Sequence, residues 1–303
     1  MGRKRRYDVQ RFSHGVILGA LRRSPAQFFL FRCYNRLVKL VVSGAVVETS
    51  FGSKIYCEPA DLIQCMIFHF GTWEPDISWV VRQILRPGDV MADVGANIGY
   101  DSLLASQLVG KTGRVVAIEA APSTFEKLQS NLALNSIENV RALKMAVSDE
   151  RGSLTLYTGD RKNVGASSII ASAERRVAVK VEALPLDELL TEDERKNLRL
   201  IKMDIEGGEP IVLKRFLKTV EMYGARTCLI VEASPQFDRA SWVELFEGFR
   251  AAGFSAYGIE NPYSPVWYLN WRKPAAPRFL QVMPDEQIDI LFIREALPPG
   301  LSA

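Results

Sequence analysis

The chain has 303 residues, of which 48% are apolar and 24% are charged, and its mean hydropathy is +0.00. This composition fits a globular protein with a sizeable core, and it excludes wholesale disorder, a collagen-like chain and a disulfide-rich scaffold. The net charge of +3 hides an asymmetry: residues 1–39 carry ten Lys or Arg residues against one acid, Asp8. The remaining residues carry 28 basic and 34 acidic side chains. A head of charge +9 therefore precedes a body of charge −6.

The few cysteines and histidines limit the chemistry that the chain can perform. The four cysteines are scattered and form no C-x-x-C pair: Cys33, Cys57, Cys65 and Cys228. Free, mostly buried thiols in a reducing compartment are therefore expected, and neither a disulfide framework nor a zinc knuckle is. With only two histidines, His14 and His69, a His-rich metal site is hard to build, so no metal site is predicted. No run approaches the ~20 apolar residues of a membrane span. No signal-peptide cleavage pattern follows the opening MGRKRR, so we expect a cytoplasmic protein.

Residues 1–40 mix arginines with Phe and Leu at partly helical spacing. Two interpretations stay open: a helical extension that packs on the main domain, or a basic amphipathic segment in peripheral contact with an anionic membrane. No recognition motif for nucleic acid is present, so no nucleic-acid partner is expected. The run 41–71 predicts one or two small hairpins. We therefore predict a basic N-terminal extension with small β elements over 1–70 and a main domain over 71–297.

From residue 72 onward, strand-like apolar runs alternate with helical segments. The predicted strands span 89–97, 114–120, 140–148, 198–207, 227–234, 255–260 and 289–295. The predicted helices span 100–109, 123–135, 210–220 and 241–252, with Ser123 as an expected N-cap and Pro210 in a first turn. This alternation predicts an α/β fold with a mostly parallel sheet covered by helices on both faces. Two further runs, 154–157 and 177–184, predict inserted hairpin strands.

Ligands of open α/β sheets bind beyond the carboxyl ends of the strands, so the first candidate is DVGANIG at 93–99. Gly95 and Gly99 allow a tight turn and a close backbone approach. Asn97 and Tyr100 stand where the dinucleotide fingerprint G-x-G-x-x-G needs glycine. A carboxylate at Asp93 would repel a pyrophosphate and attract a cation. S-adenosylmethionine, which carries an ammonium and a sulfonium and no phosphate, fits better, although Asp93 as a simple cap of loop amides stays an alternative.

The ends of two more predicted strands carry residues that could bind the ribose and the base of a nucleoside. Glu119 ends the next predicted strand, 24 residues after Gly95, where an acid can accept hydrogen bonds from two ribose hydroxyls. This feature is common to NAD and S-adenosylmethionine and does not separate them. Ala146 and Val147 lie near the end of the third strand, where adenine commonly rests on apolar residues.

The fourth strand end places charges where a core strand would be apolar. Lys202, Asp204 and Glu206 alternate, and alternate residues of a strand share one face. Burying such charges costs several kcal/mol unless they are paired or useful. A structural Lys–Asp pair is one interpretation. The other is an edge that faces the transferred group and the acceptor, with Asp204 as the base, Glu206 as the second candidate and Lys202 positioning Asp204.

Several segments in a fixed order carry a resemblance to one family. They are DVGANIGYDSLLAS at 93–106, VVAIEAAPSTFEKLQSNLALN at 115–135, AVSDERGSLTLY at 146–157, LPLDELL at 184–190 and LIKMDIEGGE at 200–209. In this order they resemble the FkbM family of S-adenosylmethionine-dependent methyltransferases over about residues 70–235. Ala120-Ala121-Pro122 and Gly208 depart from the usual pattern of the family. Neither departure threatens cofactor binding.

The resemblance implies a class I methyltransferase fold, a Rossmann-like seven-stranded sheet with its last strand antiparallel. It also implies methyl transfer to oxygen, commonly a hydroxyl of a sugar, a glycolipid or polysaccharide, or a natural product. Carried onto this chain, the cofactor-binding residues are Asp93, Gly95, Asn97 and Gly99 for the methionine part, Glu119 for the ribose, and Ala146 and Val147 near adenine. Asp204 and Glu206 would face the transfer site. A non-catalytic nucleotide-binding module and an NAD-dependent oxidoreductase stay as alternatives, the latter disfavoured by the broken glycine fingerprint.

The C-terminal part holds a Pro-rich segment, 261–284, between two predicted strands, and it contributes several aromatic residues. An ordinary loop and an acceptor-binding lid both fit this composition.

Overall fold

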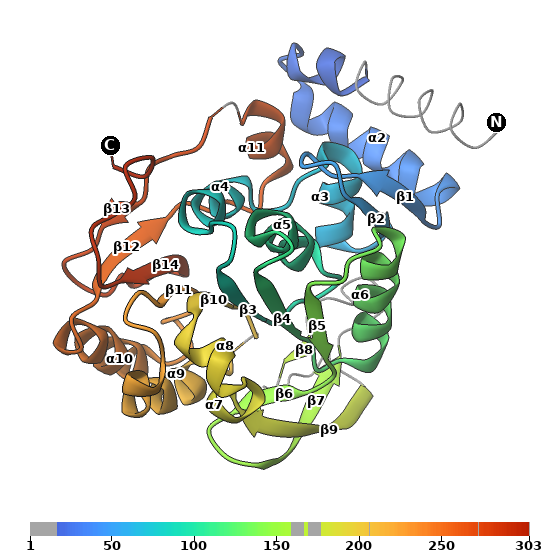
Figure 1. Ribbon diagram of the computed structural model, residues 1–303. Coiled ribbons are helices and arrows are strands. Elements are labelled where there is room, and N and C mark those ends of the chain that lie inside the picture. The colour runs from blue at the N-terminus through green and yellow to red at the C-terminus, as the bar shows by residue number, and fades with distance from the viewer. Residues whose placement is uncertain (1–16, 159–166, 169–176, 206, 272, 303) are drawn as a thin grey trace.

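The structure is a computed structural model that describes residues 17–158, 167–168, 177–205, 207–271 and 273–302. An eight-stranded sheet runs through the centre of the molecule in the order β13-β12-β14-β11-β10-β3-β4-β5 (Figure 1). Its strands are β3 (Val90–Val94), β4 (Arg114–Ile118), β5 (Val140–Leu143), β10 (Leu198–Met203), β11 (Cys228–Ala233), β12 (Ser255–Ile259), β13 (Arg278–Phe279) and β14 (Ile288–Ile293). Strands β5, β4, β3, β10 and β11 are mutually parallel, and β14 pairs antiparallel with both β11 and β12.

This topology confirms the predicted α/β fold with an antiparallel final strand. The seven longer strands are the expected seven, and the eighth, β13, is a two-residue edge strand next to β12. The helices are α2 (Gln27–Val41), α3 (Leu62–Phe70), α4 (Pro75–Ile84), α5 (Tyr100–Val109), α6 (Pro122–Leu134), α7 (Leu186–Leu189), α8 (Glu192–Lys196), α9 (Glu209–Lys218), α10 (Arg239–Ala251) and α11 (Pro265–Asn270), with a 3-10 turn at Val220–Met222.

Alternating strand residues give the sheet two apolar faces. On one face Met91, Leu200 and Ile230 pack under α4 and α5, and α6 covers the neighbouring part of the same side. On the other face Ala92 and Ile201 pack with α9 and α10. Figure 1 shows these helices as layers on either side of the sheet. Strand alternation predicts this division, because successive side chains of a strand point to opposite faces.

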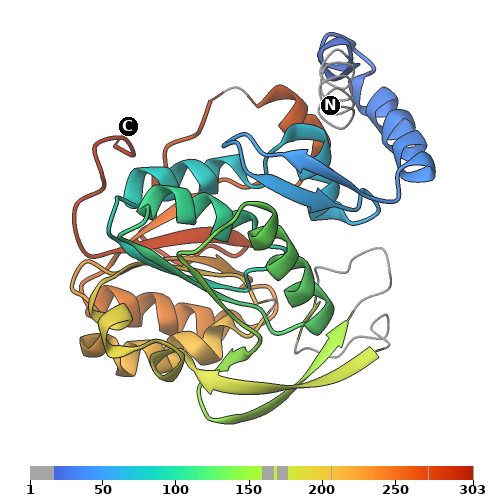
Figure 2. The same ribbon diagram turned by 45° about the vertical axis from the view of Figure 1, so that its right-hand side comes forward.

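The chain before α4 corrects part of the sequence prediction. The run 41–71 forms one hairpin, β1 (Ala45–Glu48) with β2 (Lys54–Cys57), and then the helix α3 instead of more strands. Helix α3 begins because the Asp61 side chain accepts a hydrogen bond from the Gln64 N–H. The hairpin and α3 lie against the α5–α6 side of the sheet, and α2 lies at the far corner (Figure 2). Ile55 and Cys65 share a core with residues of α5 and α6, and the domain boundary at residue 70 stays a prediction.

The predicted strand 140–148 divides at residues 144 and 145. Its first part is β5, and its second part is β6 (Ala146–Ser148), which joins a separate four-stranded sheet. That sheet has the order β6-β9-β7-β8 and also contains β7 (Gly152–Thr158), β8 (Ser167–Ser168) and β9 (Val177–Pro185). The inserted strands 154–157 and 177–184 are thereby confirmed. This small sheet projects beside the carboxyl end of the central strands, where it can form a wall of a site (Figure 2).

Two smaller predictions also have outcomes. Helix α6 begins at Pro122 with Ala121 as its N-cap and no side-chain cap, so Ser123 as an N-cap is wrong. The cysteines are free, as predicted, with Cys33 exposed and the other three buried. In the described part of the chain, no helix is both long and apolar enough to cross a membrane.

Candidate active site

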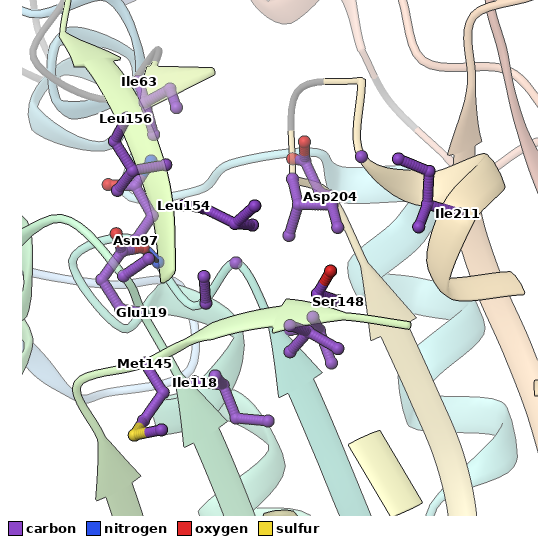
Figure 3. A pocket seen from close by; sticks show the side chains of 17 residues that line it. Ile63, Asn97, Ile118, Glu119, Met145, Ser148, Leu154, Leu156, Asp204 and Ile211 are labelled. Atoms are coloured by element: carbon purple, nitrogen blue, oxygen red, sulfur yellow. Dashed lines mark hydrogen bonds between the residues drawn. The ribbon is translucent and has the colours of Figure 1, made fainter. Parts of the chain in front are cut away.

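A cleft opens at the carboxyl ends of β3, β4 and β10 and is closed on one side by β6 and β7. Figure 3 shows Asn97 and Glu119 on one side of the cleft and Asp204 and Ile211 on the other, with Leu154 pointing between them. This is the edge at which parallel sheets bind their ligands, because neighbouring loops diverge there.

The loop after β3 approaches the loop after β10 very closely. Gly95 has φ +84°, and a Cβ built on it would lie 1.8 Å from the backbone oxygen of Asp204. No side chain fits there, which explains why the loop needs glycine. Asn97 also has a positive φ, 49°, and its side-chain Oδ1 accepts a hydrogen bond from the Ile98 N–H at 2.8 Å. The loop backbone is therefore held in one shape at the floor of the cleft.

Glu119 is fixed by backbone donors from two loops. Its Oε2 accepts from the Asn97 N–H at 2.9 Å, and its Oε1 accepts from the Ala121 N–H at 2.8 Å. Burial raises the pKa of Glu119 to about 6, and the backbone N–H groups of Ala121, Asn97 and Ala120 oppose that rise. At neutral pH the side chain is therefore an oriented carboxylate with lone pairs left for a ligand.

Much of the remaining wall of the cleft is apolar. Ala146 and Val147 line it from β6, as the sequence predicts for the neighbourhood of a base. Leu154 and Leu156 of β7 and Ile63 of α3 add to this surface and were not predicted. For Leu154 and Leu156 the sequence signal was only the alternation of β7, which predicts a strand and does not show what the strand faces.

Behind the cleft, one ammonium is surrounded by carboxylates. The Nζ atom of Lys202 lies 3.2 Å from Asp101 Oδ2, 3.6 Å from Glu74 Oε2 and 3.9 Å from Asp204 Oδ2. Lys202 is buried, and these carboxylates raise its pKa well above its usual value although burial alone would lower it. We call Lys202, Asp101, Glu74 and Asp204 the Lys202 cluster.

The sequence did not identify two members of the Lys202 cluster, Asp101 and Glu74, as functional. Glu74 is the more deeply buried of the two. It is 2% exposed and has φ +43°, a left-handed backbone that costs an ordinary residue of the order of 1 kcal/mol. Its Oε1 accepts from the Asn261 Nδ2 at 2.9 Å and lies 3.1 Å from the Tyr263 hydroxyl. Burial raises its pKa, and Lys202 opposes the rise. Contacts from residues almost 190 positions away explain why local sequence could not find it.

Asp204 connects the cluster to the cleft. Its side chain is 29% exposed, whereas that of Lys202 is 7% exposed, so only Asp204 reaches the open space. Partial burial raises the pKa of Asp204 to about 6, Lys202 lowers it, and the carboxylates of Glu232, Asp101 and Glu119 raise it further. A carboxyl group with this pKa is ionised at neutral pH and can accept a proton.

The structure places the predicted residues at different distances from the cleft. Gly95, Asn97, Glu119, Ala146, Val147 and Asp204 line one cleft. Asp93 lies behind it, 1% exposed, where it accepts a hydrogen bond from the Ser102 hydroxyl and where burial raises its pKa to about 7. Lys202 is likewise behind the cleft, and Gly99 begins α5 away from it. Glu206 lies outside the described residues.

A second cavity opens at the same edge of the sheet, between the end of β12 and the start of β14. Its walls carry Asn261, Tyr263, Gln287 and Asp289. Asn261 Nδ2 donates to Asp289 Oδ2 at 2.8 Å as well as to Glu74, so the cavity wall is joined to the Lys202 cluster. Among the described residues, no group of three or more His, Cys, Asp or Glu side chains has an arrangement that could hold a metal ion.

The sheet order with its antiparallel last strand, and the glycine loop after β3, are those of a class I, S-adenosylmethionine-dependent methyltransferase domain. The family model "Methyltransferase FkbM domain" matches residues 93–256, more than half of the chain. This protein therefore belongs to the FkbM methyltransferase family. The assignment favours methyl transfer over the NAD-dependent oxidoreductase considered above.

Two relatives that this chain resembles are methyltransferases. "Methyltransferase 1" of Beauveria bassiana is 30% identical over 142 residues, which cover 41% of this chain and 57% of that protein. The hexuronic acid methyltransferase AglP of Haloferax volcanii is 27% identical over 145 residues, or 46% of this chain and 55% of that protein. The chain thus spans little more than half the length of these relatives. A solved S-adenosylmethionine-dependent O-methyltransferase of Thermotoga maritima has a TM-score of 0.43 and 16% identity, covering 84% of this chain and 78% of that one.

Proposed function

We propose that this protein transfers a methyl group from S-adenosylmethionine to a hydroxyl oxygen of a sugar, a glycan or a natural product. The observation that carries the proposal is the cleft itself, which holds Glu119 on one side and Asp204 on the other (Figure 3). One carboxylate can bind a nucleoside while the other lies free to handle a proton. A purely nucleotide-binding module has no use for the second.

The residues present fit S-adenosylmethionine. The cleft offers an apolar surface for a base at Ala146, Val147 and Leu154, and an oriented carboxylate for hydroxyl groups at Glu119. The cluster behind it has more carboxylates than ammonium groups, which suits a cationic ligand. When bound, S-adenosylmethionine supplies a methyl group activated by a positively charged sulfur.

Asp204 is the proposed base. A sugar hydroxyl must lose its proton as its oxygen forms the new bond, and Asp204 is the carboxylate of the Lys202 cluster that reaches the cleft. Lys202 acts as a positioning residue, because its Nζ lies 3.9 Å from Asp204 and is itself fixed by Asp101. Holding reactants in line can supply about 7–11 kcal/mol at best, and proton acceptance adds a further factor.

The second cavity is the proposed seat of the acceptor. Asn261, Tyr263, Gln287 and Asp289 provide the amide, hydroxyl and carboxylate groups that bind sugar hydroxyls. The Tyr263 hydroxyl lies 3.1 Å from both Glu74 Oε1 and Glu232 Oε1, so the cavity and the Lys202 cluster form one continuous polar network. This supports the lid interpretation for the first part of segment 261–284. The name of the hexuronic acid methyltransferase relative is consistent with a sugar acceptor.

The test is Asp204→Asn, which keeps the shape of the side chain and removes the base. Methyl transfer from labelled S-adenosylmethionine is measured with hexuronic acids, neutral sugars and glycan extracts as acceptors, at saturating cofactor. We expect turnover to fall by about 10²–10⁴-fold and cofactor affinity by titration calorimetry to stay within a few-fold. In the unaltered protein the rate should rise with pH through about 6, because Asp204 must be ionised, and the variant should lose this rise.

The matched control is Asp285→Asn, at a carboxylate whose side chain is 75% exposed and lines neither cavity. Near-normal turnover in Asp204→Asn would remove Asp204 from the mechanism. Transfer to nitrogen or carbon acceptors only, with none to hydroxyl groups, would overturn the oxygen assignment and leave the cofactor assignment standing.

A further inference from the structure

Helix α2 exposes an unusual amount of apolar surface. Seven of the exposed large apolar side chains lie between residues 17 and 41: Ile17, Phe28, Phe29, Leu30, Leu37, Leu40 and Val41. Phe29 is 66% exposed, Leu40 is 74% and Val41 is 80%. Scattered exposed apolar residues are ordinary on a protein surface, whereas a contiguous patch indicates a site of contact.

The opposite side of α2 packs against the rest of the protein, so the exposed side is not the face that α2 buries in the core. Phe31 is 1% exposed and stacks on Phe70 with ring centroids 5.7 Å apart, and it shares a small core with Leu269 of α11. Asn35 accepts a hydrogen bond from the Cys65 thiol and lies 3.0 Å from His69 Nε2. These contacts fix which face of α2 points outward.

The exposed face is divided lengthwise into an apolar and a basic half. At 3.6 residues per turn, Phe29, Cys33 and Leu37 follow one another along the helix, with Leu40 beside them. Arg32, Arg36 and Lys39 form a second row next to this one, and all three are exposed. The helix has no acidic residue, so the whole outer face is apolar or positive. We call these two rows the outer face of α2.

We propose that the outer face of α2 lies on the surface of an anionic lipid membrane, with its apolar row among the acyl chains and its basic row against the headgroups. The pattern is that of an interfacial helix: apolar residues on one side and Lys or Arg beside them. Helix α2 has 15 residues and three cations, so it lies in the plane of the membrane and does not cross it. This binding is separate from methyl transfer and needs no ligand in the cleft.

Charge complementarity favours lipid over a second copy of the chain. A symmetric contact between two α2 helices would bring the same basic rows together, and like charges repel across an interface. An anionic bilayer meets both rows at once.

The test uses the purified full-length protein and vesicles of phosphatidylcholine, with or without phosphatidylglycerol. We expect co-sedimentation with the mixed vesicles and at least tenfold weaker binding to phosphatidylcholine alone, because each Lys or Arg near an anionic surface contributes roughly fivefold. The variants Leu37→Glu/Leu40→Glu and Arg32→Glu/Arg36→Glu should each lose at least tenfold in binding. The control variant Phe237→Glu/Val282→Glu should leave binding unchanged, because these two side chains, 75% and 71% exposed, lie outside α2.

A second measurement needs no altered residue. Cys33 is the exposed cysteine and lies within the apolar row, while the other three are buried, so an environment-sensitive dye will label it selectively. We expect a blue shift of the dye when mixed vesicles are added. Absence of this shift, or equal binding of both α2 variants and the controls, would overturn the proposal. Loss of self-association in the α2 variants without vesicle binding by the unaltered protein would show that a second copy covers the face instead. S-adenosylmethionine binding, measured alongside, should stay unchanged in every variant.

Discussion

Gly95→Ala is the sharpest test of the cleft geometry. The new Cβ would meet the Asp204 backbone oxygen at 1.8 Å, whereas real Cβ contacts essentially never fall below 3.0 Å. The loops after β3 and β10 must therefore move apart by about 1.2 Å, since the contacting atom is backbone and cannot rotate away. The residue also has φ +84°, which costs an alanine roughly 1–2 kcal/mol by itself.

Gly253→Ala is the matched control. Gly253 has φ +85°, nearly the same as Gly95, but nothing lies within 4 Å of a Cβ built on it. The control variant therefore loses only the unfolding free energy that the left-handed backbone costs an alanine. The difference in unfolding free energy between the two variants measures the contact with the Asp204 backbone oxygen. We expect Gly253→Ala to lose about 1–2 kcal/mol of unfolding free energy, and Gly95→Ala to lose about 1–3 kcal/mol more, as overpacked sites do.

Two assays separate the outcomes. Denaturant unfolding measures the free-energy difference, and titration calorimetry measures S-adenosylmethionine affinity in both variants. Only Gly95→Ala should weaken the cofactor, by tenfold or more, because only that change separates the loops that carry Asn97 and Asp204. Equal losses of stability in the two variants, together with unchanged cofactor affinity, would refute the close approach of these loops.

Two further predictions concern the ligands of the cleft and the second cavity. Glu119→Gln should weaken S-adenosylmethionine binding by about 10–100-fold, because a hydrogen bond to a charged group contributes roughly 1.5–3 kcal/mol. In the unaltered protein, calorimetry should show that the affinity falls below pH 6, because Glu119, with its pKa of about 6, then takes up a proton. An affinity that does not change with pH would contradict this role of Glu119. Gln287→Ala removes a polar group of the second cavity. The KM for the acceptor should rise about fivefold with kcat unchanged, because one neutral hydrogen bond to the acceptor is lost. A fall in kcat alone would show that Gln287 does not bind the acceptor.

The sequence predicts the sheet well because its signals are local. The apolar run of β3 and the helical pattern of α5 lie next to each other, and DVGANIG between them predicts both the turn and the ligand edge. Glu119 and Asp204 were found for the same reason, since each follows a buried strand directly. A candidate site residue can therefore be predicted from the sequence when its position depends only on the strand that it follows.

Other parts of the molecule depend on distant contacts. Helix α3 reads as LIQCMIFHF, a run that is apolar except for Gln64 and His69. Its helical state is stabilised by burial against the hairpin and α2, so periodicity alone does not distinguish it from a strand. The interruption between β5 and β6 redirects the chain into the second sheet, and no turn residue marks it. Glu74 belongs to the site only because Asn261 and Tyr263 reach it from the far end of the domain.

The charge asymmetry of the chain acquires a physical meaning from the site. Asp101, Glu74 and Asp204 converge on Lys202 alone, so the centre of the body is negative and favours a cationic ligand. The same negative body would be repelled by an anionic membrane. Exposed charges are screened beyond about 10 Å at ordinary salt, so cations can offset this repulsion only where they touch the lipid. Arg32, Arg36 and Lys39 stand on the outer face of α2, at the corner of the molecule away from the sheet (Figure 2). With these cations on α2, the protein can keep a negatively charged cluster around Lys202 and still bind an anionic membrane.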